Sequence, residues 1–378
     1  MRFADIIGNH EAINALRSMV DSNKIPHAIL LSGPGGIGKM ATARAFAAYI
    51  NCPDRADGDS CGVCPACRRI ADNNNPDLHY VFPIVRRKTL NKLSAADYTE
   101  EWNRMLEESP YMDPAKWLEL IDAENSQPQI AVEESNVISA TASMSAFADK
   151  YKIFIIWLPE RLGPEAANKL LKLIEEPFED TLFICVSNDA GSILPTIYSR
   201  LRRIDMTRPS DKEVEQALVA KGVSPMAAST YARLADGSLL KAFSLLENAG
   251  ETDEFFGYFK SAMRDSYSRK GDSLRLLAEN LASLGREKSL RPLDYFSRMT
   301  RENFRANLCV PPLNVMTTEE TEFSTRFAPF INAKNVEAIC REIDAARTDI
   351  SRNANAKLVW FDFLLRLMML IRGYIPKD

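Results

Sequence analysis

The chain has 378 residues, of which 46% are hydrophobic and 26% are charged; this excludes wholesale disorder and predicts two or three folded domains. With 51 acidic and 47 basic residues the formal net charge is −4, which excludes a global basic field. Any DNA contact would have to come from a local patch. We find no targeting signal after Met1, and the longest apolar stretch, 358–371, is too short to span a bilayer. We therefore expect a cytoplasmic protein without a membrane segment.

In chain order, the hydrophobic pattern predicts alternating helices and strands over the first half of the sequence. Short apolar runs indicate buried strands, and longer runs with helical periodicity indicate helices. The predicted helices are residues 1–25, 40–50 and 164–176, and the predicted strands are 27–33, 151–158 and 181–187. Strands that alternate with helices predict an α/β fold, with a parallel sheet covered by helices on both faces.

Residues 86–128 form an insertion that is predicted to contain two helices. The first begins near Ser94, and the second opens at Asp113 and Pro114. Large apolar side chains share one face of each helix, which is typical of helices packed on a sheet edge; binding of a partner is the alternative. The basic cluster Arg86, Arg87 and Lys88 fits a solvated loop, and contact with a DNA backbone is its alternative.

No strand is predicted after residue 208. The pattern indicates three domains: an α/β domain over residues 1–208, a small helical domain over 209–249 and a second helical domain over 250–378. Leucine, methionine and aromatic residues are frequent in the last of these.

The segment GPGGIGKM, residues 33–40, nearly matches a phosphate-binding loop. Such a loop needs glycines so that backbone N–H groups turn towards phosphate oxygens, a lysine to neutralise them, and a helix N-terminus behind them. The candidate nucleotide-binding residues are Gly33, Gly35, Gly36, Gly38 and Lys39. Met40 stands where a Ser or Thr hydroxyl would bind Mg²⁺, and a thioether is a poor ligand for that ion. We therefore expect ATP binding to be weak or absent.

The acidic groups of an ATPase are also missing from their expected place. An Asp for Mg²⁺ and a Glu for water activation would stand at the end of the strand 151–158. Trp157 and Leu158 stand there instead. Glu160 and Glu165 follow, and we expect them to be solvated acids at a helix start. The chain is thus predicted not to hydrolyse ATP by itself.

Four of the seven cysteines fall within sixteen residues, with the spacing C-x8-C-x2-C-x2-C. Four closely spaced thiolates without histidine predict a closed, structural zinc site made by Cys52, Cys61, Cys64 and Cys67. An iron–sulfur cluster and reduced cysteines without metal are the alternatives. The remaining cysteines, Cys185, Cys309 and Cys340, are predicted to be small buried apolar residues.

Several segments occur in the order found in one protein family. They are FADIIG, PHAILLSGPGGIGK, the four-cysteine insertion, NPDLH, EAANKLLKLIEEP and ILPTIYSRL. Over residues 3–245 the chain resembles the AAA+ clamp-loader subunits of bacterial DNA polymerase III, which include the ATP-hydrolysing gamma/tau subunits and the related delta-prime subunit. The resemblance implies an AAA+ P-loop domain, a helical lid and an all-α collar that holds the chain in a ring.

The departures from the family pattern resemble those of delta-prime. Leu240 falls on the position of the sensor-2 arginine, so this group is missing together with the hydroxyl and the acids. Ser199 and Arg200 match the Ser-Arg-Cys motif, although Leu201 replaces the Cys. The resemblance implies that Arg200 is an arginine finger that acts on the ATP of a neighbouring subunit. A surface arginine in the cluster Arg200, Arg202 and Arg203 is the alternative reading.

The resemblance also implies the partners. These are gamma/tau-type ATPase subunits and a delta-type subunit in a heteropentamer, the sliding clamp, and primed DNA reached through the complex. The chain would then be a subunit of a DNA-directed DNA polymerase complex. Two alternatives stay open: an active gamma/tau-like ATPase that uses Glu160, and an AAA+ adaptor outside replication, which the long insertion and Leu201 favour.

Overall fold

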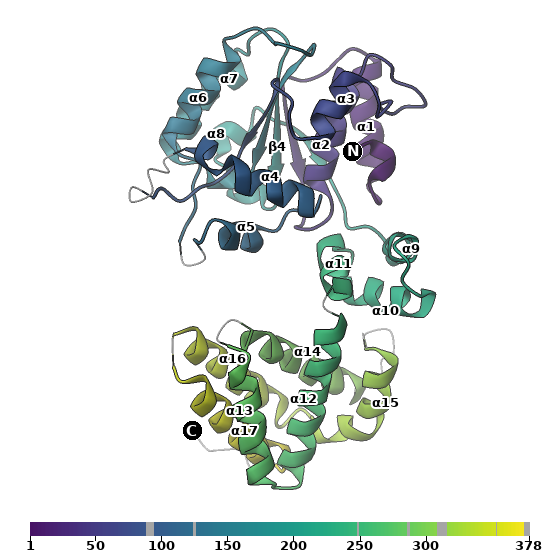
Figure 1. Ribbon diagram of the computed structural model, residues 1–378, viewed down its shortest axis with the longest axis vertical. Helices are drawn as coiled ribbons and strands as arrows, with labels where there is room; N and C mark the ends of the chain where they lie inside the picture. The colour runs from purple at the N-terminus through teal and green to yellow at the C-terminus, as the bar shows by residue number, and fades with distance from the viewer. Residues whose placement is uncertain are drawn as a thin grey trace. The chain divides into compact units, whose positions relative to one another are not determined.

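The computed structural model (Figure 1) describes residues 1–87, 94–123, 126–247, 249–285, 288–307, 316–352 and 354–373. The chain forms two compact units. The first comprises Met1–Val223 and Ala235–Phe243, and the second comprises Ser224–Leu234 and the residues from Ser244 onward. The three-domain division, with boundaries after residues 208 and 249, stays a prediction. Lys88 and Cys309, for which the sequence made predictions, lie outside the described residues.

A five-stranded sheet forms the centre of the first unit, in the order β2-β3-β4-β1-β5. All neighbouring strands are parallel, so their carboxyl ends lie at one edge of the sheet. The strands are β1 (Ala28–Ser32), β2 (Leu78–Val81), β3 (Lys152–Trp157), β4 (Thr181–Ser187) and β5 (Arg202–Asp205).

The three central strands were predicted from the sequence, and the two edge strands were not. Strands β1, β3 and β4 are buried at every residue, which is why each reads as a continuous apolar run. Strand β5 exposes three of its four side chains, and β2 has only four residues, so neither gives an apolar pattern of useful length.

Alternate side chains of the sheet enter two separate cores, as the pleat of a strand requires. Ile29 and Leu31 pack with the helices α1 (His10–Asp21) and α2 (Lys39–Asn51). Leu30 and its neighbours on the opposite face pack with α6 (Val132–Ala142) and α7 (Pro164–Glu175). The predicted α/β fold with helices on both faces is therefore confirmed, although the start of the chain forms only a short 3-10 turn, η1 (Phe3–Asp5), before α1.

The longest described stretch of the insertion, residues 94–123, is called the insert below. It contains a 3-10 turn, η3 (Ala95–Tyr98), and two helices, α4 (Thr99–Glu108) and α5 (Pro114–Leu120), as the sequence predicted. Its apolar side chains join the core that contains α2, and Trp102 stacks on Phe82 just after the edge strand β2, with ring centroids 4.1 Å apart. The insert is thus a helix pair packed at the sheet edge.

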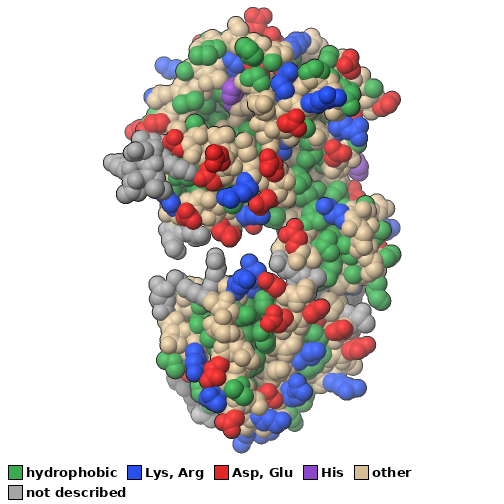
Figure 2. Space-filling model, viewed as in Figure 1, with side chains coloured by type: hydrophobic (Ala, Val, Ile, Leu, Met, Phe, Trp, Pro, Cys, Tyr) green, Lys and Arg blue, Asp and Glu red, His purple; other side chains and the backbone are tan. Residues whose placement is uncertain are grey.

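All elements that follow β5 in the described residues are helical, and two further helices precede that strand. The remaining helices are α3 (Pro65–Ala71), α8 (Pro195–Tyr198), α9 (Asp211–Ala220), α10 (Pro225–Ala235), α11 (Leu239–Glu247), α12 (Ala249–Tyr267), α13 (Gly271–Ser283), α14 (Leu290–Asn307), α15 (Thr318–Phe327), α16 (Val336–Ser351) and α17 (Ala356–Ile371). Among the helices described, none is both long and apolar enough to cross a membrane. On the face shown in Figure 2, acidic and basic side chains are interspersed over the surface.

Candidate functional site

The predicted phosphate loop lies between β1 and α2, at the carboxyl edge of the sheet. Lys39 is the first residue of α2, and Gly38 caps it with φ +93°. Gly36 also adopts a left-handed backbone, with φ +76°, which favours glycine at both positions. Gly35 lies close to Asn188, which follows β4: a Cβ at Gly35 would be 3.9 Å from the Asn188 Nδ2 atom. The loop therefore has the local backbone that the motif predicts.

The cation of the loop is bound by the loop itself. The Lys39 ammonium donates hydrogen bonds to the carbonyl oxygens of Gly33, at 2.7 Å, and of Pro34. Burial lowers the pKa of Lys39 to about 8, against a smaller opposing effect of the Glu160 carboxylate. A lysine that is buried and bonded in this way is less available for a phosphate group than one that points into solvent.

Two other segments of the first unit cover the loop. The backbone N–H of Leu240 donates to the Gly36 carbonyl at 3.2 Å, and a Cβ at Gly36 would lie 2.4 Å from the Ser238 hydroxyl oxygen. From the insert, the Tyr111 ring lies against Gly38, where a Cβ would be 3.3 Å from the Tyr111 Cε1 atom. Tyr111 also packs on Phe243, with ring centroids 5.4 Å apart.

The positions that would carry hydrolytic groups hold buried apolar side chains. Met40 and Trp157 are each 2% exposed, and Leu158 is 6% exposed. Trp157 packs against Trp102 of the insert, with ring centroids 5.4 Å apart. None of these side chains can bind Mg²⁺ or activate a water molecule.

The expectation of a solvated Glu160 is wrong. Its carboxylate is half-buried and accepts hydrogen bonds from the Ser187 hydroxyl, at 2.8 Å, and from the Asn188 N–H, at 3.1 Å. The reason is the turn after β3: Leu158 has φ +57°, and the 3-10 turn Pro159–Arg161 that follows brings Glu160 to the end of β4. Glu165, in contrast, is exposed in the first turn of α7, as predicted.

Arg200 follows α8 and lies on the surface, with its side chain 37% exposed. Its guanidinium forms an ion pair with Glu175, the last residue of α7, and donates to the Thr196 carbonyl at 2.8 Å. Two residues later β5 begins, so Arg200 lies at the amino edge of the sheet, whereas the phosphate loop lies at the carboxyl edge.

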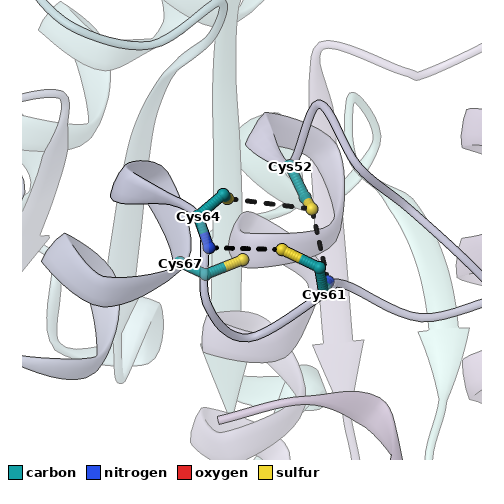
Figure 3. Close-up of side chains that lie close together, drawn as sticks. All are labelled: Cys52, Cys61, Cys64 and Cys67. Atoms are coloured by element: carbon teal, nitrogen blue, oxygen red, sulfur yellow. Dashed lines mark hydrogen bonds between the residues drawn. The ribbon is translucent and has the colours of Figure 1, made fainter.

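The four clustered cysteines come together at the other end of α2 (Figure 3). Cys52 caps that helix, Cys64 caps α3, Cys67 lies within α3, and Cys61 lies in the loop between them. Their sulfur atoms all lie within 4.8 Å of one another. A tetrahedral zinc ion with Zn–S bonds of about 2.3 Å requires sulfur atoms about 3.8 Å apart. The Cys52 and Cys64 sulfurs are separated by 3.9 Å, so the cluster could hold such an ion.

The surroundings favour the ionised thiolate form at Cys61 but not at Cys52 and Cys67. Backbone N–H groups of Val63 and Cys64 lower the pKa of Cys61 to about 7. Burial raises the pKa values of Cys52 and Cys67, so these two thiols are hard to ionise without a bound cation. A divalent metal ion would supply that charge, and a protein without it would have to bury neutral thiols.

The cluster and the phosphate loop are separate sites. Helix α2 has 13 residues and joins Lys39 to Cys52, so the two ends are about 20 Å apart at a rise of 1.5 Å per residue. A metal ion at the cysteines would therefore be structural. The cluster is tied to the start of the chain by Asp59, whose buried carboxylate accepts from the N–H groups of Phe3 and Ala4.

Sequence reasoning missed two residues that surround the loop, Tyr111 and Ser238, and misplaced a third, Glu160. Each approaches the loop from a distant part of the chain, and the sequence around each gives no local sign of that approach. The positive φ needed at Gly36 and Gly38 could be predicted from the glycines, but the side chains that fill the space beside them could not.

Comparison with known proteins supports one family. The family model described as "DNA polymerase III, delta subunit" matches residues 8–210. The chain is similar to DNA polymerase III subunit tau of Bacillus subtilis, 28% identical over 258 residues, which are 66% of this chain and 38% of that protein. It is 25% identical over 240 residues to subunit delta' of the same organism, covering 64% of this chain and 58% of that protein.

Among solved structures, the chain was matched to a DNA polymerase III gamma subunit-related protein of Thermotoga maritima, with a TM-score of 0.44 and 14% identity; the match covers 96% of this chain and 100% of that one. The curated relatives above are matched over about two-fifths to three-fifths of their length. More than half of the chain matches the family model. The chain therefore belongs to the DNA polymerase III delta subunit family, a family of bacterial clamp-loader subunits of the AAA+ type.

Proposed function

We propose that this chain is the delta-prime-type subunit of the bacterial clamp loader and does not hydrolyse ATP. The observation that carries the proposal is the apolar character of the hydrolytic positions: Met40, Trp157 and Leu158 are all buried and offer no ligand for Mg²⁺. Its partners would be gamma/tau-type ATPase subunits and a delta-type subunit in a cytoplasmic heteropentamer. That complex would load the sliding clamp on primed DNA.

Within this proposal, Arg200 is an arginine finger that acts on the ATP of a neighbouring subunit. Its place in the sheet supports action in trans. Arg202 is in register with Ile29 of β1, and the phosphate loop begins four residues further along that strand. At about 3.3 Å per residue, the loop of the same chain lies about 13 Å further along the sheet. A neighbour's ATP is the remaining target for this exposed guanidinium.

The ion pair with Glu175 does not oppose this role. An ion pair between exposed groups contributes only about 0–1 kcal/mol, because water screens the charges. A transferring phosphoryl group offers a stronger partner, since its developing charge is met by two planar donors of the guanidinium. Glu175 would therefore hold Arg200 in place until the neighbour binds ATP.

The proposal also assigns zinc to Cys52, Cys61, Cys64 and Cys67, in a structural role. The donor set and the sulfur separations support this assignment. Zinc would link α2 to α3 and to the loop that carries Cys61, on the side of the unit away from the phosphate loop.

The experiment is ATP turnover by the reconstituted clamp-loader complex, stimulated by DNA and clamp. Arg200→Ala should slow turnover at the neighbouring site roughly tenfold or more, because a finger contributes a factor of 10³ to 10⁵ in other P-loop systems. Total loss is not expected where other subunits keep their own fingers. Arg200→Lys should restore little, because an ammonium lacks the planar pair of donors.

Arg203→Ala is the matched control. Arg203 is exposed, lies three residues away and forms an ion pair with Asp205, yet it is not part of the Ser-Arg motif. This variant should turn over ATP at the parent rate. Equal rates for the Arg200→Ala and parent complexes, with assembly confirmed by gel filtration, would mean that Arg200 is only a surface arginine.

A second candidate function is that of an active gamma/tau-like ATPase. One observation favours it: the Glu160 carboxylate lies close enough to the phosphate loop to oppose the lowering of the Lys39 pKa by burial, and it accepts hydrogen bonds from Ser187 and Asn188 at the end of β4. An acid in this place could orient a water molecule. The turnover of the isolated chain, considered in the Discussion, separates the two candidates.

A further inference from the structure

The insert and the segment 235–243 meet over the phosphate loop within one compact unit. Gly36 contacts Ser238 and Leu240, and Gly38 contacts Tyr111. The two covering segments are more than a hundred residues apart in the sequence, and Tyr111 joins them through its contact with Phe243. The contacts of Tyr111 with Gly38 and Phe243 are called the latch below.

Tyr111 is buried and held in place by hydrogen bonds of the insert. The Ser109 hydroxyl oxygen accepts a hydrogen bond from the Tyr111 N–H at 3.1 Å, which fixes the turn between α4 and α5. On either side, the insert is bonded to the chain that follows β2: the Tyr98 hydroxyl donates to the Val85 carbonyl and the Trp117 indole N–H donates to the Pro83 carbonyl, both at 2.8 Å. Tyr111 itself is 7% exposed.

The same insert fills the place of the missing acids. Trp157 at the end of β3 packs on Trp102, which in turn packs edge to face on Trp117, with centroids 5.4 Å apart in both pairs. The aromatic core of the insert therefore continues to the strand end at which an ATPase would bind Mg²⁺ and activate water. One segment of about thirty residues thus contacts both the phosphate loop, through Tyr111, and the end of β3, through Trp102.

We propose that the insert takes over the closing role of a nucleotide: the latch holds the segment 235–243 against the phosphate loop, so that the first unit stays closed without any ligand. Lys39 is satisfied by the Gly33 and Pro34 carbonyls in this state and needs no phosphate. This inference rests on the proposed function, since a subunit that does not hydrolyse ATP can keep one conformation while its neighbours change theirs.

The test is hydrogen–deuterium exchange of the full-length chain, read by mass spectrometry on the peptide that contains Leu240. The Leu240 N–H donates to the Gly36 carbonyl, so its exchange reports whether the segment rests on the loop. In the parent protein we expect the same slow exchange with and without millimolar Mg-ATP. Rapid exchange that becomes slow only when Mg-ATP is added would overturn the proposal, because a nucleotide would then close the unit.

Variants of the latch make the test specific. Tyr111→Ala should speed the exchange of the Leu240 N–H roughly three- to tenfold, because the variant loses the stabilisation that one aromatic pair provides. Tyr111→Phe is the matched control: it keeps the ring and should behave as the parent. The peptide of β4, residues 181–187, serves as an internal reference and should keep its protection.

If Tyr111→Ala also loosens β4, Phe243→Ala opens the same contact from a half-buried residue and decides the question. Unchanged exchange of Leu240 in whichever variant keeps β4 protected would refute the latch. A refuted latch would leave the prediction for Arg200 unaffected. Arg200 lies at the opposite edge of the sheet from the latch, and it is tested by ATP turnover of the complex. The two proposals can therefore fail separately.

Discussion

At the scale of single residues, this protein keeps the glycines of a nucleotide site but not its reactive groups. Gly36 and Gly38 retain a backbone that few other residues could adopt, and Lys39 is still present, yet its ammonium is turned onto carbonyl groups of its own loop. In this structure the loop is packed against Leu240, Ser238 and Tyr111. Glycine is favoured at Gly36 and Gly38 by the left-handed backbone, and at Gly36 also because a Cβ would lie 2.4 Å from the Ser238 hydroxyl oxygen.

The cysteine cluster gives a prediction at the same scale. The purified protein should contain one zinc ion per chain, and Cys64→Ser should reduce that content, since an alcohol is a poor replacement for a thiolate ligand. The variant should lose local stability around α3 while the second unit stays folded. Zinc can be measured by atomic emission, and local stability by limited proteolysis between residues 52 and 72. Cys340→Ser, outside the cluster, is the control and should keep its zinc; iron with visible absorbance in the parent would reject the zinc assignment.

At the scale of elements, the connection between β2 and β3 depends on one buried carboxylate. Asp77 directly precedes β2, and its oxygens accept hydrogen bonds from the N–H groups of Phe147, Ala148 and Asp149 at 2.6–2.9 Å. Burial alone would raise the pKa of Asp77, but these three donors and Lys152 lower it below its usual value. The aspartate of the NPDLH segment therefore fixes the turn that enters β3.

This arrangement predicts a pH-dependent loss of stability. Asp77→Asn should lower the free energy of unfolding of the first unit by about 2 kcal/mol at pH 7, because an amide accepts from fewer donors and loses the charge. A lowered pKa means that the aspartate stabilises the fold above its unfolded pKa of about 3.9. That stabilisation disappears as the pH falls through the folded value. The difference between parent and variant should therefore shrink below about pH 4.

Urea unfolding followed by tryptophan fluorescence can measure the difference. Trp360→Phe as a common background leaves Trp102, Trp117 and Trp157, all in the first unit, as reporters. Asp72→Ala removes an exposed aspartate and should change little. A gap between parent and Asp77→Asn that stays constant down to pH 3 would contradict the assigned role of the carboxylate.

At the scale of the whole molecule, the prediction is that the isolated chain hydrolyses ATP no faster than background. Met40 stands where a hydroxyl would bind magnesium, Trp157 where an acid is expected, and Leu240 where an arginine would stabilise charge. Three separate contributions to hydrolysis are therefore expected to be missing. Lys39→Ala should leave this rate unchanged. If the parent shows a steady-state rate that Lys39→Ala abolishes, this chain has a working ATPase site. If Glu160→Gln also abolishes that rate, the gamma/tau-like candidate is favoured.

The sequence by itself determined the features that depend on short stretches of chain. The central strands are buried at every residue and so read as apolar runs. The glycines specify the loop, and four cysteines within sixteen residues can meet around one point because the chain between them is short. The helices of the insert were also predictable, since their buried residues recur at the helical period.

Only the tertiary structure decided what lies beside the loop and where the acids point. Asp77 meets its donors 70 residues away, and Tyr111 and Leu240 reach the loop from two separate segments that both follow it far along the chain. Glu160 was misplaced because its position depends on a left-handed turn at Leu158, a conformation that leucine rarely adopts. Contacts of this kind follow from how the packed elements close on one another, and no local pattern of residue types encodes them.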